Sequence, residues 1–249
     1  MKIQQLLGTL IAIALISIPV RSQSPDSAED VLKQGVERAA QGNFDGAIAD
    51  YTRAIQINSR MTGLGNSPCP GSEIIVSDLF NALALNNRGF ARFCKGDWET
   101  ALVDFNRAIR MQPQLADTYN NRGNVWQQQG DLEKALADFN QAIKLNPRHS
   151  AAFNNRANLY QAKGNLAEAV ADYSQSISLN PAKAIAFANR GLTLLQLGHF
   201  AEANADFQHA LALNPGLNAQ LARLIQSETN TATSPKPVLS TINTNKEKP

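Results

Sequence analysis

The sequence has almost no net charge and contains few histidine and cysteine residues. Its 249 residues include 23 basic and 21 acidic side chains, which gives a formal net charge of +2. A nearly neutral chain lacks the basic surface that displaces counterions from a phosphate backbone. We therefore expect no nucleic-acid partner.

Histidine is scarce as well. None of the three, His149, His199 and His209, shares a local cluster with cysteine or carboxylate residues at metal-ligand spacing. The glycines form no phosphate-binding loop, because helix ends account for them. We expect surface histidines, and we predict no bound metal, no cofactor, no small-molecule substrate and no enzymatic activity.

Cysteine occurs twice, as Cys69 and Cys94. In an oxidising compartment such a pair can close a loop and stabilise the fold by about 2–4 kcal/mol. Pairing is not deducible from sequence alone. Two alternatives therefore stay open: a disulfide between Cys69 and Cys94, or a buried Cys94 with Cys69 as a loop thiol.

An apolar run extends from Leu6 to Val20, which is short for a membrane-spanning helix of about 20 residues. It follows a basic start and precedes small and polar residues, a pattern typical of a secretory signal peptide cut after Ser22. We expect residues 1–22 to be a signal peptide, residues 23–27 a linker, and the protein to be exported to the periplasm or beyond. The alternative is an uncleaved segment that anchors the protein to the membrane.

Glycine, proline and several other residues recur every 34 positions. A fixed period of this length indicates an array of one small unit, each copy burying its apolar face against the next. The recurring sets are Gly96, Gly130, Gly164 and Gly198; Pro113, Pro147, Pro181 and Pro215; Asn87-Arg88, Asn121-Arg122, Asn155-Arg156 and Asn189-Arg190.

Each unit reads as two helices joined by a short turn. Gly130 is suited to end the first helix in a left-handed conformation, and Asp131 to cap the amides of the second. An apolar stripe at helical spacing follows from Leu132 to Ile143. Pro147 ends the second helix, because proline disfavours helical geometry in the residue before it.

This pattern resembles the tetratricopeptide repeat (TPR). The matching positions of one copy are Tyr119, Arg122, Gly123, Trp126, Ala135, Phe139 and Pro147. The resemblance implies an all-α fold: a right-handed TPR superhelical solenoid of about five helix-turn-helix repeats with a C-terminal capping helix. Together with the signal-like start of the chain, it suggests an exported bacterial type of TPR protein.

The period places the repeat boundaries. We predict repeats at residues 28–61, 82–115, 116–149, 150–183 and 184–216, an insertion at 62–81, a capping helix at 217–227 and a disordered tail at 228–249.

Arginine and aspartate recur 16 residues apart, one on each helix of a unit. The pairs are Arg88 with Asp104, Arg122 with Asp138, Arg156 with Asp172, and Arg190 with Asp206. Ion pairs that join helices within or between repeats are the simplest interpretation. The first repeat breaks the pattern, because Gln34 stands opposite Asp50.

Amide side chains gather on the first helix of each unit. The resemblance implies that these helices line a concave groove, where amides match the N–H and C=O groups of an extended peptide. The candidate groove residues are Asn86, Asn87, Asn120, Asn121, Asn124, Gln127, Asn154, Asn155, Asn158, Gln161 and Asn189. The alternative is that some of these amides bond neighbouring helices. Apolar anchors for the peptide are expected at Phe90, Phe93, Leu192 and Leu195.

The predicted function is that of a protein–protein interaction scaffold or adaptor that binds an extended segment of a protein partner. Two alternatives remain. One is a self-associating TPR array, which would be a homo-oligomer, and the other is an accessory subunit of an enzyme without catalysis of its own.

Overall fold

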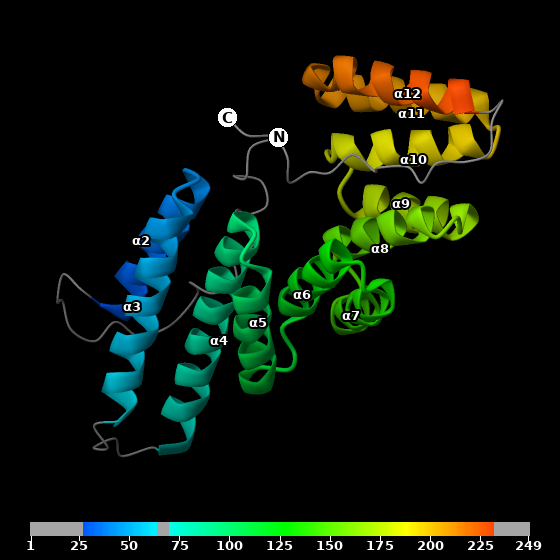
Figure 1. Ribbon diagram of the computed structural model, residues 1–249. Coiled ribbons are helices and arrows are strands. Elements are labelled where there is room, and N and C mark those ends of the chain that lie inside the picture. The colour runs from blue at the N-terminus through cyan, green and yellow to red at the C-terminus, as the bar shows by residue number, and fades with distance from the viewer. Residues whose placement is uncertain (1–26, 64–69, 232–249) are drawn as a thin grey trace. The chain divides into compact units, whose positions relative to one another are not determined.

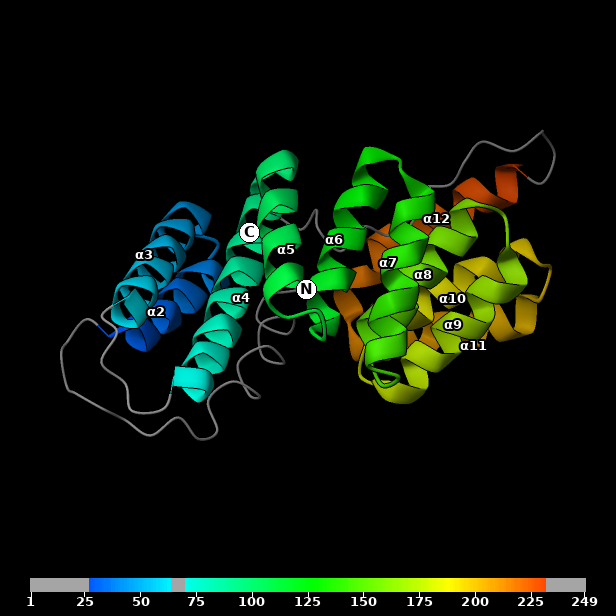
Figure 2. The same ribbon diagram turned by 90° about the horizontal axis from the view of Figure 1, so that it is seen from below.

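The computed structural model describes residues 27–63 and 70–231, and every regular element in them is helical (Figures 1 and 2). The expected signal peptide, Cys69 and residues 232–249 of the expected tail lie outside the described residues. None of the described helices is long and apolar enough to cross a membrane.

The helices form consecutive antiparallel pairs, which confirms the predicted all-α repeat fold. The first helices of the pairs are α2 (Ala28–Ala40), α4 (Pro70–Lys95), α6 (Ala116–Gln129), α8 (Ser150–Ala162) and α10 (Ala184–Gln196). The second helices are α3 (Phe44–Gly63), α5 (Trp98–Met111), α7 (Leu132–Leu145), α9 (Leu166–Leu179) and α11 (Phe200–Leu213). The short turn η1 (Pro215–Leu217) and helix α12 (Asn218–Thr231) follow them.

The chain divides into two compact units within α6. Among the described residues, the first unit holds α2 to α5 and α6 up to Val125, and the second begins at Trp126 and holds the rest of α6 with α7 to α12.

The insertion is largely helical. Helix α3 continues to Gly63 and α4 begins at Pro70, so residues 70–81 lengthen the first helix of the second repeat. The segment from Ser72 to Asn81 contains neither glycine nor proline, which permits this extension. Asn58 holds the two helices together, since its Nδ2 donates to Asn81 Oδ1 over 3.1 Å.

The C-terminal helix covers the last repeat, as a capping helix would. Leu217 and Leu221 are buried in one cluster with Leu192 and Phe207. Helix α12 runs to Thr231, which is longer than the segment 217–227 expected from the sequence.

The turn between paired helices has one geometry throughout. Gly130 has a φ of 82° and Gly164 a φ of 80°, in the left-handed region that favours glycine. Gly42, Gly96 and Gly198 share this conformation, which confirms the predicted helix ends. Asp131 caps α7 as expected, because its side chain accepts from Lys134 N over 3.2 Å.

A small residue on the first helix lets the second helix pack closely. A Cβ atom added to Gly89 would lie 2.8 Å from Phe105 Cε1, and one added to Gly191 would lie 2.7 Å from Phe207 Cε1. No real Cβ atom is accommodated at that distance without a shift. The fourth repeat has Ala157 at this position, packed with the buried ring of Tyr173.

The predicted arginine–aspartate pairs form in the second, fourth and fifth repeats, in which both residues belong to the same compact unit. Arg156 donates from Nε and Nη2 to the two carboxylate oxygens of Asp172, at 2.6 and 2.8 Å. Arg88 with Asp104 and Arg190 with Asp206 repeat this two-point contact. In the first repeat Asp50 is paired instead with Arg38, at 2.9 Å.

The arginine of the second to fifth repeats also reaches the preceding repeat. Arg156 Nη1 donates to Asn140 Oδ1 on α7 over 2.6 Å, so one guanidinium joins the second helices of two repeats. The equivalent bonds run from Arg88 to Thr52, from Arg122 to Asn106 and from Arg190 to Ser174. We call this set the arginine bridges.

Substitution of Arg156 by Met should destabilise the protein by about 2–3 kcal/mol. The change keeps most of the apolar stem but leaves the buried carboxylate of Asp172 without its cation. Urea unfolding followed by circular dichroism measures the loss. The control is Lys134→Met, which breaks the more exposed pair of Lys134 with Asp131 and should cost no more than about 0.5 kcal/mol. Equal effects of the two changes would contradict a structural role for the bridge.

Candidate functional site

The candidate site is the set of amide residues predicted to line the groove, which we call the amide face. The structure divides this set by exposure. Buried members are Asn86, Asn120, Asn121, Asn154, Gln161 and Asn189, and half-exposed members are Asn87, Asn124, Gln127, Asn155 and Asn158. Only the second group is open to a ligand without movement of the helices.

In the first unit, buried amides connect neighbouring first helices. Asn121 Nδ2 on α6 donates to Asn86 Oδ1 on α4 over 3.1 Å. Asn86 Nδ2 in turn donates to Asn87 Oδ1 over 3.3 Å. Bonding between helices, the alternative left open by the sequence, therefore accounts for Asn86 and Asn121.

In the second unit, the corresponding contact has shifted by one helical turn. Asn189 Nδ2 on α10 donates to Asn158 Oδ1 on α8 over 3.1 Å. The buried hydroxyl of Tyr173 on α9 lies 2.6 Å from the same oxygen and 3.1 Å from Gln161 Oε1. Three helices thus meet at Asn158, whose side chain is still half-exposed.

The expected apolar anchors lie mostly in the core. Phe93 and Leu192 are buried, whereas Phe90 and Leu195 are half-buried. The rings of Phe90 and Phe93 pack with centroids 6.5 Å apart. Phe90 is therefore the aromatic residue of this group that retains some exposed area.

One repeat position, at the junction before a helix, carries a polar residue at two places in the chain and an apolar residue at two others. Leu115 packs against an apolar cluster there, and Leu217 is buried there. His149 and Lys183 take this position before α8 and α10. His149 is buried, so the expectation of a surface histidine was wrong for it, while His199 and His209 are exposed.

Lys183 is half-buried and carries no counter-ion among the described residues. Loss of water around its amine lowers the pKa of Lys183 to about 8. Its position has an apolar residue in two other repeats, so comparison of the repeats position by position would have revealed the lysine as unusual.

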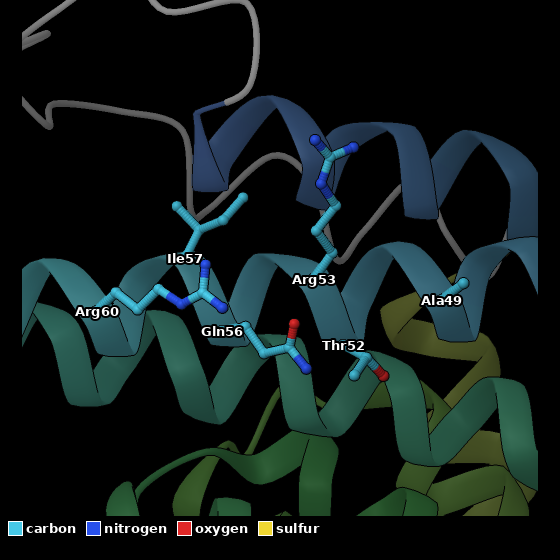
Figure 3. A pocket seen from close by; sticks show the side chains of 6 residues that line it. All are labelled: Ala49, Thr52, Arg53, Gln56, Ile57 and Arg60. Atoms are coloured by element: carbon cyan, nitrogen blue, oxygen red, sulfur yellow. The ribbon is translucent and has the colours of Figure 1, made fainter.

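An open hollow of about 720 Å³ lies along α3, and the sequence did not indicate it. Figure 3 shows the side chains that line it. Its described lining residues all come from that helix. They are Ala49, Thr52, Arg53, Gln56, Ile57 and Arg60. Thr52 also accepts the bond from Arg88, so part of the lining serves the arginine bridges.

Cys94 is exposed, and so is not the buried residue of the second alternative. Because Cys69 lies outside the described residues, the disulfide remains a prediction. The described residues contain no group of three or more histidine, cysteine or acidic side chains arranged to hold a metal ion.

Paired helices, a repeated glycine turn and contacts between successive repeats define a helical repeat scaffold. The sequence matches family profiles described as tetratricopeptide repeat at residues 116–149, 139–171 and 157–229, and as TPR repeat at residues 89–130. Together these matches extend over more than half of the chain, from residue 89 to residue 229. The chain belongs to the tetratricopeptide repeat family.

Solved TPR proteins share the fold. TTC0263 from Thermus thermophilus is 20% identical with a TM-score of 0.62, covering 82% of this chain and all of its own. MamA is 20% identical with a TM-score of 0.53, covering 74% of this chain and 96% of its own. YrrB, described as a TPR protein with an unusual peptide-binding site, is 19% identical with a TM-score of 0.52. The match covers 82% of this chain and 92% of the YrrB chain. A comparison with curated proteins finds no match.

Substitution of Lys183 by Leu, the residue of two equivalent positions, should stabilise the protein by about 1–2 kcal/mol at pH 7. The native amine has a folded pKa near 8, below its free value of 10.5, so the unfolded chain binds its proton more tightly. The free energy of unfolding of the native protein should therefore increase between about pH 8 and 10.5, and its difference from the variant should become smaller over that range. Chemical unfolding of both proteins at pH 7, 9 and 10 tests this. A constant difference across that range would contradict a buried charged amine.

Proposed function

We propose that this protein is a binding scaffold that holds an extended segment of a protein partner against its amide face, in the concave groove expected from the family. Half-exposed amides offer both hydrogen-bond donors and acceptors, which suits the alternating groups of a peptide backbone. A rigid preformed array loses little freedom when the segment binds, which favours affinity.

The observation that carries this proposal is the exposure of Asn124 and Gln127. They lie on successive turns of α6, and both remain half-exposed where Asn120 and Asn121 of the same helix are buried. Asparagine is a poor helix former, so a helix surface that needed only solubility would favour other polar residues. The presence of Asn124 in mid-helix therefore supports a ligand-facing role for it, with Gln127 one turn further along the same side of the helix.

The fold neighbours support the same kind of function. YrrB is described as having a peptide-binding site, and it shares with this chain the paired-helix repeat. Phe90 adds a half-exposed aromatic ring to the first unit, close along α4 to Asn87. This combination suits a partner segment that carries an apolar side chain next to backbone N–H and C=O groups without hydrogen-bond partners.

We also propose that the protein acts outside the cytoplasm. The support is the basic start and the short apolar run of residues 1–22. Expression in a bacterial host followed by intact mass analysis of the envelope fraction tests this. We expect a chain that begins at residue 23, and a full-length mass would favour the membrane-anchored alternative.

Replacement of both Asn124 and Gln127 by Ala should weaken partner binding at least tenfold and leave folding intact. Neither side chain makes a hydrogen bond to the described residues of its own unit, so the helix should keep its packing. The probe is a dodecapeptide selected on the native protein from a random displayed library, with affinity measured by fluorescence polarisation.

The matched control is Gln175→Ala, which removes an exposed amide from α9 outside the amide face. Its affinity should equal that of the native protein. Unchanged binding by the double variant, with an unchanged circular dichroism spectrum, would refute the amide face as the binding surface.

A further inference from the structure

Two exposed apolar side chains lie at the turn between α10 and α11. Phe200, the first residue of α11, is 67% exposed, more than any other large apolar residue that the structure describes. Leu197, directly after α10, is 40% exposed, and only Gly198 and His199 separate the two. We call Leu197 and Phe200 the apolar tip. Single apolar residues are often exposed on soluble proteins, so the equivalent residues of the other repeats show whether this exposure is unusual.

In earlier repeats the residue equivalent to Phe200 packs against the following repeat. Phe44 is half-buried against a cluster that contains Ala91 of α4, and Leu132 packs against a cluster that contains Leu159 of α8. The other two residues at this position are Trp98, which is 36% exposed, and Leu166, which is half-buried. Of the five residues at this position, all of which the structure describes, only Phe200 is mostly exposed.

Helix α12 covers the core of the fifth repeat but supplies no apolar cover for the tip. Leu221, in its first half, is buried in the core cluster. In the third repeat the covering residue Leu159 stands 27 positions after Leu132, and the residue 27 positions after Phe200 is Ser227. The last six residues of α12, 226–231, include no apolar residue. An apolar cover for Phe200 therefore has to come from another segment or another molecule.

The end of α12 lies at the side of the second unit that carries the tip. The turn η1 reverses the chain between α11 and α12, and α12 packs on α10. Figures 1 and 2 show that α12 ends at the side where α10 is joined to α11. Thr231, the last described residue, therefore lies at the same side as Leu197 and Phe200.

The sequence after Thr231 contains one short apolar group. Residues 232–249 are mostly Ser, Thr, Asn, Lys and Pro, and their large apolar residues are Val238, Leu239 and Ile242. Val238 follows Thr231 by seven positions, and seven extended residues span up to about 25 Å. The axes of packed helices such as α10 and α12 are about 8–10 Å apart. The segment 237–242 is therefore long enough to reach the tip.

We propose that segment 237–242 of this chain binds to the apolar tip, with Val238 and Leu239 against Phe200 and Leu197. The segment takes the place that the next first helix has in the earlier repeats. The chain thus closes the end of its own array, and a partner that used the tip would first have to displace the segment. This inference is independent of the proposed function, because the tip is not part of the amide face.

The small size of the tip favours an attached segment over a second molecule. A stable interface between proteins buries about 800 Å² on each partner, far more than two side chains provide. A segment joined to α12 by a few residues has an effective concentration in the millimolar range. A small apolar contact is therefore sufficient within one chain and insufficient between two.

The first repeat argues against stacking of a second copy on the tip. The exposed residues of α2 are all polar: Asp30, Lys33, Gln34, Glu37 and Arg38. A copy that placed this helix over Phe200 would remove these groups from water without giving them hydrogen-bond partners on the aromatic ring.

Charge favours the same occupant. Glu202 is exposed, two positions after Phe200, and Lys236 stands two positions before Val238. Contact between Val238 and the ring of Phe200 would bring these opposite charges near each other, which favours the bound arrangement.

The direct test observes the methyl groups of Val238 and Leu239 in the native full-length protein by carbon-13 NMR, with signals assigned from Val238→Ala and Leu239→Ala. We expect nuclear Overhauser contacts between these methyl groups and the ring of Phe200, and upfield shifts caused by that ring. Methyl signals of both residues at the positions of an unfolded chain would overturn the inference.

Removal of the ring tests the role of Phe200. Phe200→Ser should return the methyl signals to unfolded-chain positions and leave the thermal midpoint close to that of the native protein, because the ring is not part of the core. The matched control is Val103→Ser, which removes a side chain on α5 that is 63% exposed, and the shifts should persist in it. Shifts that persist in Phe200→Ser as well would contradict the proposed contact.

A second measurement identifies what covers the tip. A soluble gadolinium chelate weakens the signals of exposed groups, and its effect on the Phe200 ring should be at least twofold larger in the double variant Val238→Ser and Leu239→Ser than in the native protein. An equal effect in the two proteins would refute cover by segment 237–242. A native effect that increases on tenfold dilution would show that a second copy covers the tip, and would also overturn the inference.

Discussion

Each repeat depends on the contact between a small residue in its first helix and an aromatic ring in its second. Gly89 against Phe105 and Gly191 against Phe207 leave no room for a further carbon atom. This close approach brings arginine and aspartate of the paired helices within direct hydrogen-bonding distance. In the fourth repeat the ring belongs to Tyr173, and its position under α8 carries a hydroxyl to the amide face.

The polar side chains of the first helices serve two purposes that burial separates. Asn86 and Asn121 are buried and bond to each other, so they align neighbouring helices. Asn124 remains half-exposed. Asn158 is also half-exposed, and its Oδ1 accepts a hydrogen bond from Asn189. In a repeat scaffold of this kind, the same residue type can align neighbouring helices or contact a partner. An amide that the next helix covers aligns the helices, and an amide that remains exposed is available to a partner.

Features set by local geometry were predictable from the sequence. The glycine turns, the paired helices and the arginine–aspartate contacts follow from residue type and spacing, and the structure shows them. Burial on the amide face was not predictable, because Asn120 and Asn124 share one side of α6 by periodicity and yet differ in exposure. Spacing places a residue on a face but does not reveal how far the next helix covers it. The buried His149 and the Tyr173 hydroxyl were missed for a related reason, since each is a single departure from a repeated position.

The arginine bridges have a consequence for the order in which the chain acquires its structure during synthesis. Arg156 contacts Asn140 of the preceding repeat and Asp172 of its own second helix. When the ribosome has released α8 but not α9, this arginine has its earlier partner and still lacks its carboxylate. Each repeat is therefore fully joined to the one before it only after its second helix has emerged. On a chain synthesised from the N-terminus, the arginine bridge of the newest repeat is therefore incomplete until the second helix of that repeat has been released.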